Sequence, residues 1–99
     1  MKVEWLSLAR QDREEQLGYI AERDPWAAIN LGDAIEQAVS HLPDHPHIGR
    51  PGRVRGTREL VVSNTPYILA YRVEQNQNTV VILRLLHGAQ NWPRRFKAT

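Results

Sequence analysis

The second half of the chain contains three short apolar runs separated by polar breaks, and this pattern constrains the fold more than any other feature. The runs are residues 60–62, 67–73 and 79–86, and the breaks are residues 63–66 and 75–78. β-Branched and aromatic residues between short polar turns are typical of strands joined as hairpins. The region 58–92 therefore predicts three consecutive strands.

Two amphipathic stretches precede these strands. Residues 7–22 have a helical composition with a thin apolar stripe, and Ser7 stands at the expected N-cap position. Asp24 and Pro25 form a second helix start, because aspartate caps free N–H groups and proline fits the first turn. Apolar residues then recur at helical spacing until Pro43 ends the helix. Since the break between the helices is short, we expect an antiparallel helical hairpin.

The order of these elements predicts the fold class. Residues 1–6 alternate apolar and polar side chains, as in a half-buried strand, and residues 43–57 form an irregular loop rich in proline, glycine and arginine. The order is β-α-α-β-β-β, so we expect an α+β fold with the helical hairpin packed on one face of a mostly antiparallel four-stranded sheet. The 99 residues predict a single domain, 1–99, whose residues 93–99 are a short basic tail.

The arginines in the strands suggest which face the helices cover. Unpaired arginines are costly beneath helices, so we expect Arg72 and Arg84 on the open face of the sheet. The residues expected to face the helices are Leu69, Tyr71 and Val73 in one strand, and Val81, Leu83 and Leu85 in the next. This register requires an odd number of residues in the loop around residues 76–78.

The composition excludes several classes of protein. The sequence has no cysteine, which excludes disulfides and thiolate metal sites. No apolar run approaches the roughly 20 residues of a membrane span, and the first residues lack the apolar core of a signal peptide. We therefore expect a cytoplasmic protein.

Charge is divided unevenly along the chain. Residues 1–48 carry a formal charge of −5, and residues 49–99 carry +7. This asymmetry indicates a positive surface for an anionic partner, either nucleic acid or an acidic protein segment. Arginine outnumbers lysine eleven to two, and its planar guanidinium suits bidentate contacts with phosphate or carboxylate. A GC-rich genome would explain that ratio, but it would not explain the segregation of charge.

Several short motifs occur in a recognisable order. They are G-R-P-G at 49–52, R-E-L at 58–60, Y-I-L-A-Y-R-V at 67–73 and I-L-R-L-L-H-G-A-Q-N-W-P at 82–93. In this order, residues 3–93 resemble the ParE branch of the RelE/ParE toxin superfamily. The resemblance implies the toxin of a type II toxin–antitoxin module, a system found on plasmids and chromosomes that inhibits growth and stabilises plasmids. It also implies a cognate antitoxin that docks a helix on the helical hairpin and adds a strand to a sheet edge.

The superfamily divides by target. RelE-type members cut mRNA on the ribosome with basic residues and a late tyrosine or histidine on the open sheet face, whereas ParE-type members poison DNA gyrase and are not nucleases. Here Ile68 stands where RelE has a catalytic arginine, residues 87–90 replace a Gly-Lys-Arg-type segment, and residues 92–99 contain no tyrosine. We therefore expect a DNA gyrase inhibitor without enzymatic activity. A RelE-like ribosome-dependent mRNA endonuclease is the first alternative, and a non-toxic family member that serves only as a binding partner is the second.

Three residues would carry the chemistry of the nuclease alternative. Histidine titrates in the useful range, so His87 could transfer a proton, while Arg72 and Arg84 could stabilise charge on the attacked phosphate. His87 shares the strand parity of Leu83 and Leu85, which favours a structural role at the end of the strand.

The other basic residues are candidates for binding a partner. Those in the glycine-hinged loop would contact an acidic protein segment or a nucleic-acid backbone, and those in the tail accompany an aromatic residue. The candidates are Arg50, Arg53, Arg55, Arg58, Trp92, Arg94 and Arg95. We expect no cofactor. We also expect no metal site at His41, His45 and His47, because prolines interrupt their spacing and no carboxylate stands convincingly beside them.

Overall fold

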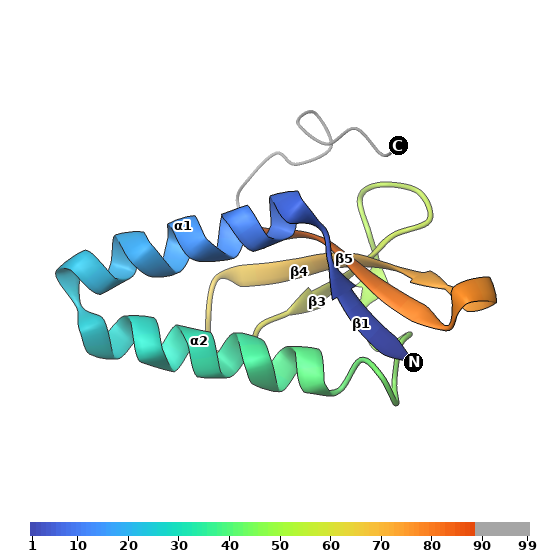
Figure 1. The fold of residues 1–99 in the computed structure, drawn as a ribbon, viewed down its shortest axis with the longest axis horizontal. Helices are drawn as coiled ribbons and strands as arrows, with labels where there is room; N and C mark the ends of the chain where they lie inside the picture. Colours follow the sequence, from blue (N-terminus) through green and yellow to red (C-terminus); the bar gives the residue numbers. More distant parts are fainter. Residues whose placement is uncertain (89–99) are drawn as a thin grey trace.

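The computed structural model describes residues 1–88, which form two helices packed on one face of a five-stranded sheet (Figure 1). The elements are β1 (Lys2–Trp5), α1 (Ser7–Arg23), α2 (Pro25–Ser40), β2 (Arg50–Pro51), β3 (Arg58–Val61), β4 (Tyr67–Glu74), a short 3-10 turn η1 (Gln75–Gln77) and β5 (Thr79–His87). The predicted α+β class and helical hairpin are confirmed. The strand count was one too low, because β2 arises within the predicted irregular loop and pairs antiparallel with β3.

The strand order is β1-β5-β4-β3-β2, so the first strand lies beside the last. β1 runs parallel to residues 79–82 of β5, and the other neighbouring strands are antiparallel. The sheet is therefore mostly antiparallel, as predicted. The backbone N–H of Leu6 then donates to the carbonyl of Ile82 at 3.0 Å, which places the start of α1 where β1 leaves the edge of β5.

The two helices begin differently. Asp24 caps α2 as predicted, since its side chain accepts a hydrogen bond from the N–H of Ala27 at 3.1 Å and Pro25 occupies the first turn. The predicted Ser7 cap of α1 is wrong: the N-cap residue is Leu6, no side chain caps this end, and Ser7 is already helical. None of the helices formed by the described residues is long and apolar enough to cross a membrane.

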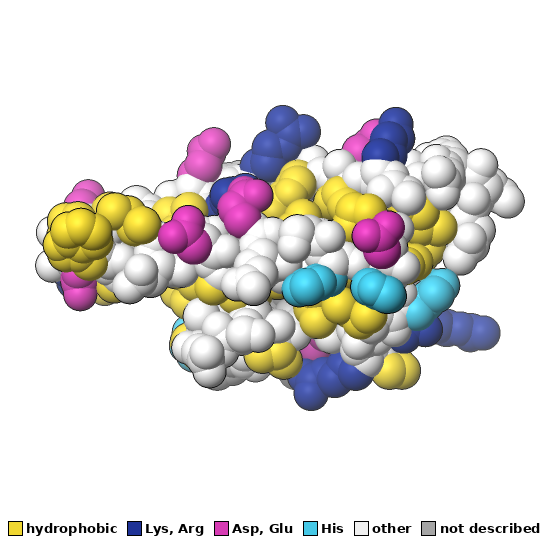
Figure 2. Space-filling model, turned by 90° about the horizontal axis from the view of Figure 1, so that it is seen from below, with side chains coloured by type: hydrophobic (Ala, Val, Ile, Leu, Met, Phe, Trp, Pro, Cys, Tyr) yellow, Lys and Arg dark blue, Asp and Glu magenta, His cyan; other side chains and the backbone are white. Residues whose placement is uncertain are grey.

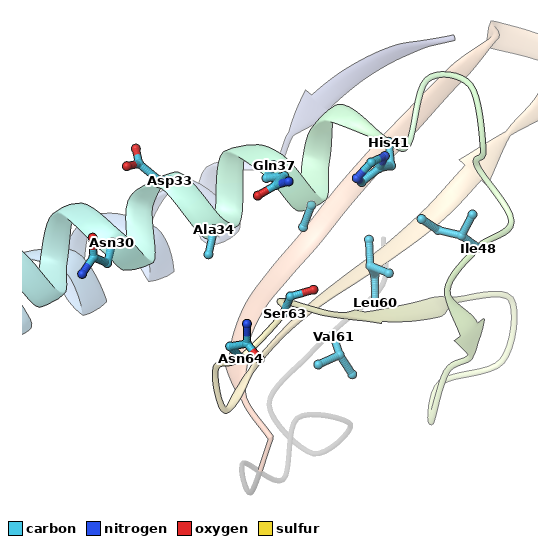
Figure 3. A pocket seen from close by; sticks show the side chains of 11 residues that line it. Asn30, Asp33, Ala34, Gln37, His41, Ile48, Leu60, Val61, Ser63 and Asn64 are labelled. Carbon is cyan, nitrogen blue, oxygen red and sulfur yellow. The ribbon is translucent and has the colours of Figure 1, made fainter.

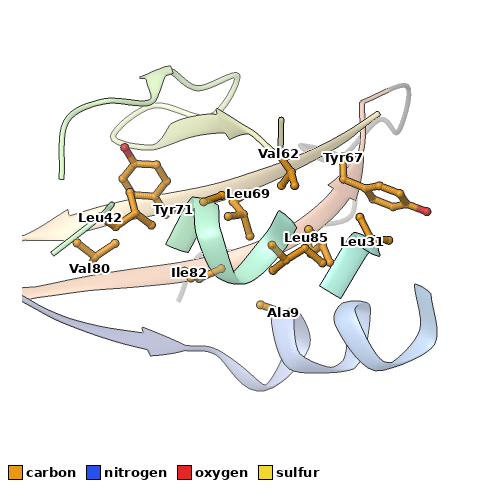
Figure 4. Packing of buried hydrophobic residues seen from close by; sticks show 12 residues of the cluster. Ala9, Leu31, Leu42, Val62, Tyr67, Leu69, Tyr71, Val80, Ile82 and Leu85 are labelled. Carbon is orange, nitrogen blue, oxygen red and sulfur yellow. The ribbon is translucent and has the colours of Figure 1, made fainter. Parts of the chain in front are cut away.

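The main core lies between the helices and the sheet (Figure 4). The side chains of β4 face as predicted, with Leu69 and Tyr71 fully buried in this core. The prediction for β5 was wrong in its first half: Val80 and Ile82 lie in the helix-side core, while Val81 and Leu83 lie in a second cluster.

Loop length and a bulge explain this difference in β5. The residues between paired Glu74 and Thr79 are 75–78, an even number, so the residue that faces the helices shifts by one. A register shift between Ala70 and Tyr71 leaves Leu83 as the extra residue. The bulge returns Leu85 to the helix-side core, where it was predicted.

The face of the sheet away from the helices carries an apolar cluster of its own. This second cluster consists of Ala70, Val81, Leu83 and Leu86, with Val54 of the β2–β3 loop packed against it. Arg84 pairs with Ala70 and so starts from this face, as predicted, but its guanidinium is buried against Asp12 of α1, whose carboxylate neutralises it. Arg72 pairs across the sheet with Val81 and so lies on the open side, as predicted.

Candidate partner-binding surface

A groove of about 610 Å³ runs between α2 and the β3–β4 hairpin (Figure 3). The α2 wall is formed by successive turns of the helix, and the opposite wall by β3 and the turn that follows it. Its lining residues are Asn30, Asp33, Ala34, Gln37, Ala38, His41, Ile48, Leu60, Val61, Ser63 and Asn64. Leu60 and the half-exposed Ile48 point into the groove, whereas Val61 points away from α2 (Figure 3). The groove therefore presents apolar side chains beside polar helix residues.

A second hollow of about 450 Å³ continues this groove toward the tip of the helical hairpin. The two hollows share Asn30, Ala34, Ser63 and Asn64, and the second adds apolar walls from Ile20, Leu31 and Tyr67. We call the two together the α2 groove. It is a continuous, partly apolar channel along one helix.

Hydrophobic side chains also gather at the tip of the hairpin, at the left of Figure 2. Trp26 is 75% exposed, Ile29 is 53% exposed and Tyr19 is 59% exposed. Tryptophan and tyrosine contribute disproportionately to binding energy at protein interfaces. The tip and the α2 groove therefore form one candidate surface for a protein partner, and the sequence analysis identified neither in detail.

The three residues of the nuclease alternative are not brought together. Arg84 donates to Asp12 from Nε at 2.7 Å and from Nη2 at 3.0 Å, and both side chains are about one-tenth exposed. Arg72 forms an ion pair with Glu74 two residues along β4. His87 is exposed at the end of β5, and its ring packs edge-on against Tyr67 with the centroids 5.7 Å apart. This packing agrees with the predicted structural role of the histidine.

The loop arginines are ordered by a residue that the sequence analysis missed. Glu59 of β3 is 2% exposed and forms ion pairs with Arg50 at 3.4 Å and Arg53 at 3.1 Å. Arg58 donates instead to the backbone carbonyls of His47 and Gly49, at 3.2 and 2.8 Å. A glutamate at a buried strand position next to arginines is the signal that could have identified this arrangement.

Two hydrogen bonds made by the Tyr71 hydroxyl hold the backbone at the start of this loop. Its hydroxyl donates to the carbonyl of Pro46 at 2.7 Å and accepts the N–H of Gly49 at 2.9 Å. Burial raises the pKa of Tyr71, and this outweighs the opposite effects of the Gly49 hydrogen bond and of the nearby Arg58 charge. The neutral phenol is therefore the form that the fold favours.

Three of the predicted partner-binding residues, and the predicted absence of a metal site, stay predictions. Trp92, Arg94 and Arg95 lie outside the described residues. Within residues 1–88, no group of three or more histidine, cysteine, aspartate or glutamate side chains is placed to hold a metal ion. His47 approaches Gln75, with 3.4 Å between their side-chain nitrogens.

Comparison with known proteins identifies the family. The family described as "ParE toxin of type II toxin-antitoxin system, parDE" matches residues 3–92. The chain belongs to the ParE toxin family. This ParE family member is 39% identical over 92 residues to a Sinorhizobium fredii protein named "Putative toxin Y4kP", covering 93% of each chain. It is also 31% identical over 84 residues to "Toxin RelE1" of Caulobacter vibrioides, covering 83% of this chain and 87% of that protein.

Solved structures show the same fold. A chain of the chromosomal ParDE toxin–antitoxin system from P. aeruginosa superimposes with a TM-score of 0.76 at 24% identity, covering 88% of the ParE family member and 95% of that chain. A chain of the toxin–antitoxin complex RelBE2 from Mycobacterium tuberculosis gives a TM-score of 0.61 at 28% identity, covering 87% and 95%. The ParE and RelE branches thus share this architecture, so the fold by itself does not select the target.

Proposed function

We propose that this ParE family member is a cytoplasmic toxin that inhibits DNA gyrase by binding it, and that a cognate antitoxin neutralises it. The observation that carries this proposal is the ParE family match across residues 3–92. The sequence motifs from which we expect gyrase as the target also resemble the ParE branch of the superfamily.

The separation of the nuclease candidates supports the same proposal. A ribosome-dependent nuclease needs an acid or base and cationic groups close to one phosphate. Here Arg84 is engaged by Asp12, Arg72 is paired with Glu74, and His87 packs at the strand end. Ala70, Val81 and Leu83 form an apolar cluster on the same face of the sheet.

The antitoxin is proposed to dock an amphipathic helix in the α2 groove. An apolar channel beside exposed aromatic residues suits a helix that presents apolar residues at three- and four-residue spacing. Ile48 would contact this helix inside the groove, and Trp26 would contact it at the hairpin tip, outside the groove lining.

A RelE-like mRNA endonuclease is the second candidate function. The observations that favour it are the 31% identity to the protein named "Toxin RelE1" and the structural match to the RelBE2 complex. Under this alternative, Arg72, Arg84 and His87 would have to reach one phosphate on the ribosome.

Two assays on the purified toxin separate the candidates. A gyrase supercoiling assay is expected to show inhibition, and primer extension on translated mRNA is expected to show intact transcripts. Codon-phased cleavage that disappears in an Arg72→Ala/His87→Ala double variant would overturn the gyrase proposal. Both substitutions avoid the buried Asp12–Arg84 pair, so the double variant should remain folded.

Antitoxin docking is tested by a matched pair of variants. Ile48→Glu places a charge in the α2 groove, whereas Leu8→Glu changes an apolar residue on α1 that is similarly exposed and does not line the groove. Co-expressed antitoxin should rescue growth and co-purify with wild type and Leu8→Glu, but not with Ile48→Glu. Equal rescue of both variants would exclude the groove as the docking site.

A further inference from the structure

The segment that contains β2, the loop after it and the first residue of β3 concentrates positive charge near the α2 groove. We call residues 49–58 the arginine loop. It carries four guanidinium groups, and Glu59, the first residue after it, supplies one buried carboxylate, so three positive charges remain uncompensated within this unit. The family match alone does not assign a role to it.

The buried carboxylate orients two of these arginines. One oxygen of Glu59 faces Nη2 of Arg50, and the other accepts both the backbone N–H of Arg53 at 2.8 Å and its Nε at 3.1 Å. The side chain of Arg50 nevertheless remains 65% exposed. A buried ion pair contributes little net stability, so the defined orientation of exposed guanidinium groups is its clearer consequence.

The other two arginines are placed differently, and neither has a carboxylate partner among the described residues. Arg58 is held by the carbonyls of His47 and Gly49, which leaves its charge without an ion pair within residues 1–88. Arg55 lies at the exposed turn of the loop and makes no hydrogen bond or ion pair with the described part of the chain. Both can attract an anionic group.

The arginine loop is continuous with the α2 groove along one strand. Leu60 and Val61 line the groove, and Arg58 and Glu59 are the preceding residues of β3. Ile48, at the entrance to the loop, also lines the groove. A chain segment that leaves the groove along β3 therefore reaches Arg58 first, and it reaches Arg50 and Arg53 by crossing the edge of the sheet, because Glu59 pairs with Ala70 of the other face.

We propose that the arginine loop binds carboxylate side chains of the antitoxin, in the segment that continues from its docked helix. This inference rests on the proposed antitoxin partner and adds a second, electrostatic part to the binding surface. Carboxylates suit the oriented guanidinium pair through bidentate hydrogen bonds. Nucleic acid is the less suitable ligand, because residues 49–58 contain no aromatic side chain on which a base could stack.

Glu59 is a positioning residue in this proposal, and its substitution provides the sharpest test. Glu59→Gln adds one net positive charge to the loop but removes the group that orients Arg50 and Arg53. Simple attraction between charges predicts tighter antitoxin binding by this variant. Orientation by Glu59 predicts binding that is weaker by about 3- to 10-fold.

Surface variants provide a test that does not depend on the stability of the loop. The Kd of the antitoxin encoded beside the toxin is measured by calorimetry at about 50 and about 300 mM NaCl. Arg55→Ala and Arg50→Ala should each raise Kd by about 3- to 10-fold at low salt, with a smaller effect at high salt. Lys2→Ala, an exposed cation on the opposite edge of the sheet, is the matched control and should leave Kd unchanged.

The outcomes distinguish this inference from the proposed function. If the wild-type toxin binds no antitoxin, both proposals fail. If wild type binds but Arg50→Ala and Arg55→Ala retain its affinity and salt dependence, the role of the arginine loop alone is overturned. A third outcome would assign the loop to nucleic acid instead. In that outcome a single-stranded oligonucleotide binds wild type but not these variants, while the affinity for antitoxin is unchanged.

Discussion

Asp12 of α1 holds Arg84 of β5 through two hydrogen bonds, at 2.7 Å from Nε and 3.0 Å from Nη2. One of the same carboxylate oxygens also accepts the backbone N–H of Leu85 at 3.0 Å. β1 pairs with β5 only as far as Ile82, so β1 offers no hydrogen-bond acceptor to the N–H of Leu85. Asp12 supplies that acceptor instead. The first helix is thus tied to the last strand by a polar contact, although few of its own side chains are buried.

Asp12→Ala should destabilise the fold by about 3–5 kcal/mol, because it leaves the Arg84 guanidinium buried without its counter-charge. The free energy of unfolding in urea measures this loss. Glu36→Ala is the matched control, since it removes a more exposed ion pair with Arg13 and should cost less than about 1 kcal/mol. Equal losses in the two variants would contradict a special role for the buried pair.

Replacing both partners of the buried pair tests the same contact differently. Asp12→Leu/Arg84→Met removes both charges together, so it should recover part of the stability lost in Asp12→Ala. Recovery should be incomplete, because the N–H of Leu85 still lacks its acceptor. The free energy of unfolding of the double variant is measured in urea. A double variant less stable than Asp12→Ala would contradict this account.

Tyr71 predicts a loss of stability in alkaline solution. Burial raises the pKa of its phenol in the folded state, so its contribution is fully present below the unfolded pKa of about 10 and is lost as pH rises through the folded pKa. Tyr71→Phe should flatten this alkaline decline. It should also cost about 1–3 kcal/mol at neutral pH, because Pro46 and Gly49 lose their hydrogen-bond partner.

Unfolding curves measured between neutral pH and about pH 11 provide the test of Tyr71. Tyr19→Phe is the control for stability, since this side chain is 59% exposed and its substitution should leave the neutral stability unchanged. Burial also raises the pKa of Tyr67, so stability in the Tyr71→Phe variant should still decline somewhat at alkaline pH. An unchanged slope in that variant would rule out Tyr71 as a source of the decline.

Gly49→Ala should destabilise the arginine loop. A Cβ at this position would lie 2.7 Å from the Tyr71 hydroxyl and 3.1 Å from the backbone carbonyl oxygen of Glu59, so the loop would have to shift by an amount that costs about 1–3 kcal/mol. Gly18→Ala, in the open middle of α1, should instead stabilise by up to about 1 kcal/mol. Thermal unfolding of the two variants should therefore move in opposite directions.

Trp26→Ala separates binding from folding. The side chain is 75% exposed, so its loss should change the free energy of unfolding by less than about 0.5 kcal/mol. If the hairpin tip is part of the antitoxin site, the same change should weaken antitoxin binding by about 2 kcal/mol. Calorimetry that gives the wild-type Kd would remove the tip from the proposed interface.

Local signals in the sequence predicted those parts of the fold that depend on neighbouring residues. The Asp24-Pro25 start of α2 and the alternation of Leu69 and Tyr71 in β4 follow from capping and from the two-residue period of a strand. The faces of β5 were not predictable in the same way. They depend on the length of one turn, where Asn78 adopts a left-handed conformation with φ of 50°, and on the bulge at Leu83.

The candidate surface depends on contacts between distant residues, which explains why only part of it was predicted. The loop arginines were identified from composition, but their partner Glu59 was not. The α2 groove arises only when α2 packs beside β3, and no motif in either segment indicates it. Arg84 illustrates the same difficulty, because Asp12, which makes its burial tolerable, lies 72 positions earlier in the chain.

The parallel pairing of β1 with β5 has a consequence for the synthesis of the protein. Residues 2–5 are synthesised long before their strand partner, residues 79–82, so this edge of the sheet cannot form until those later residues have left the ribosome. Contacts between such distant segments form slowly compared with local helices. A growing chain therefore exposes β1 without its strand partner until β5 has been synthesised, and the sheet acquires its finished shape only after that.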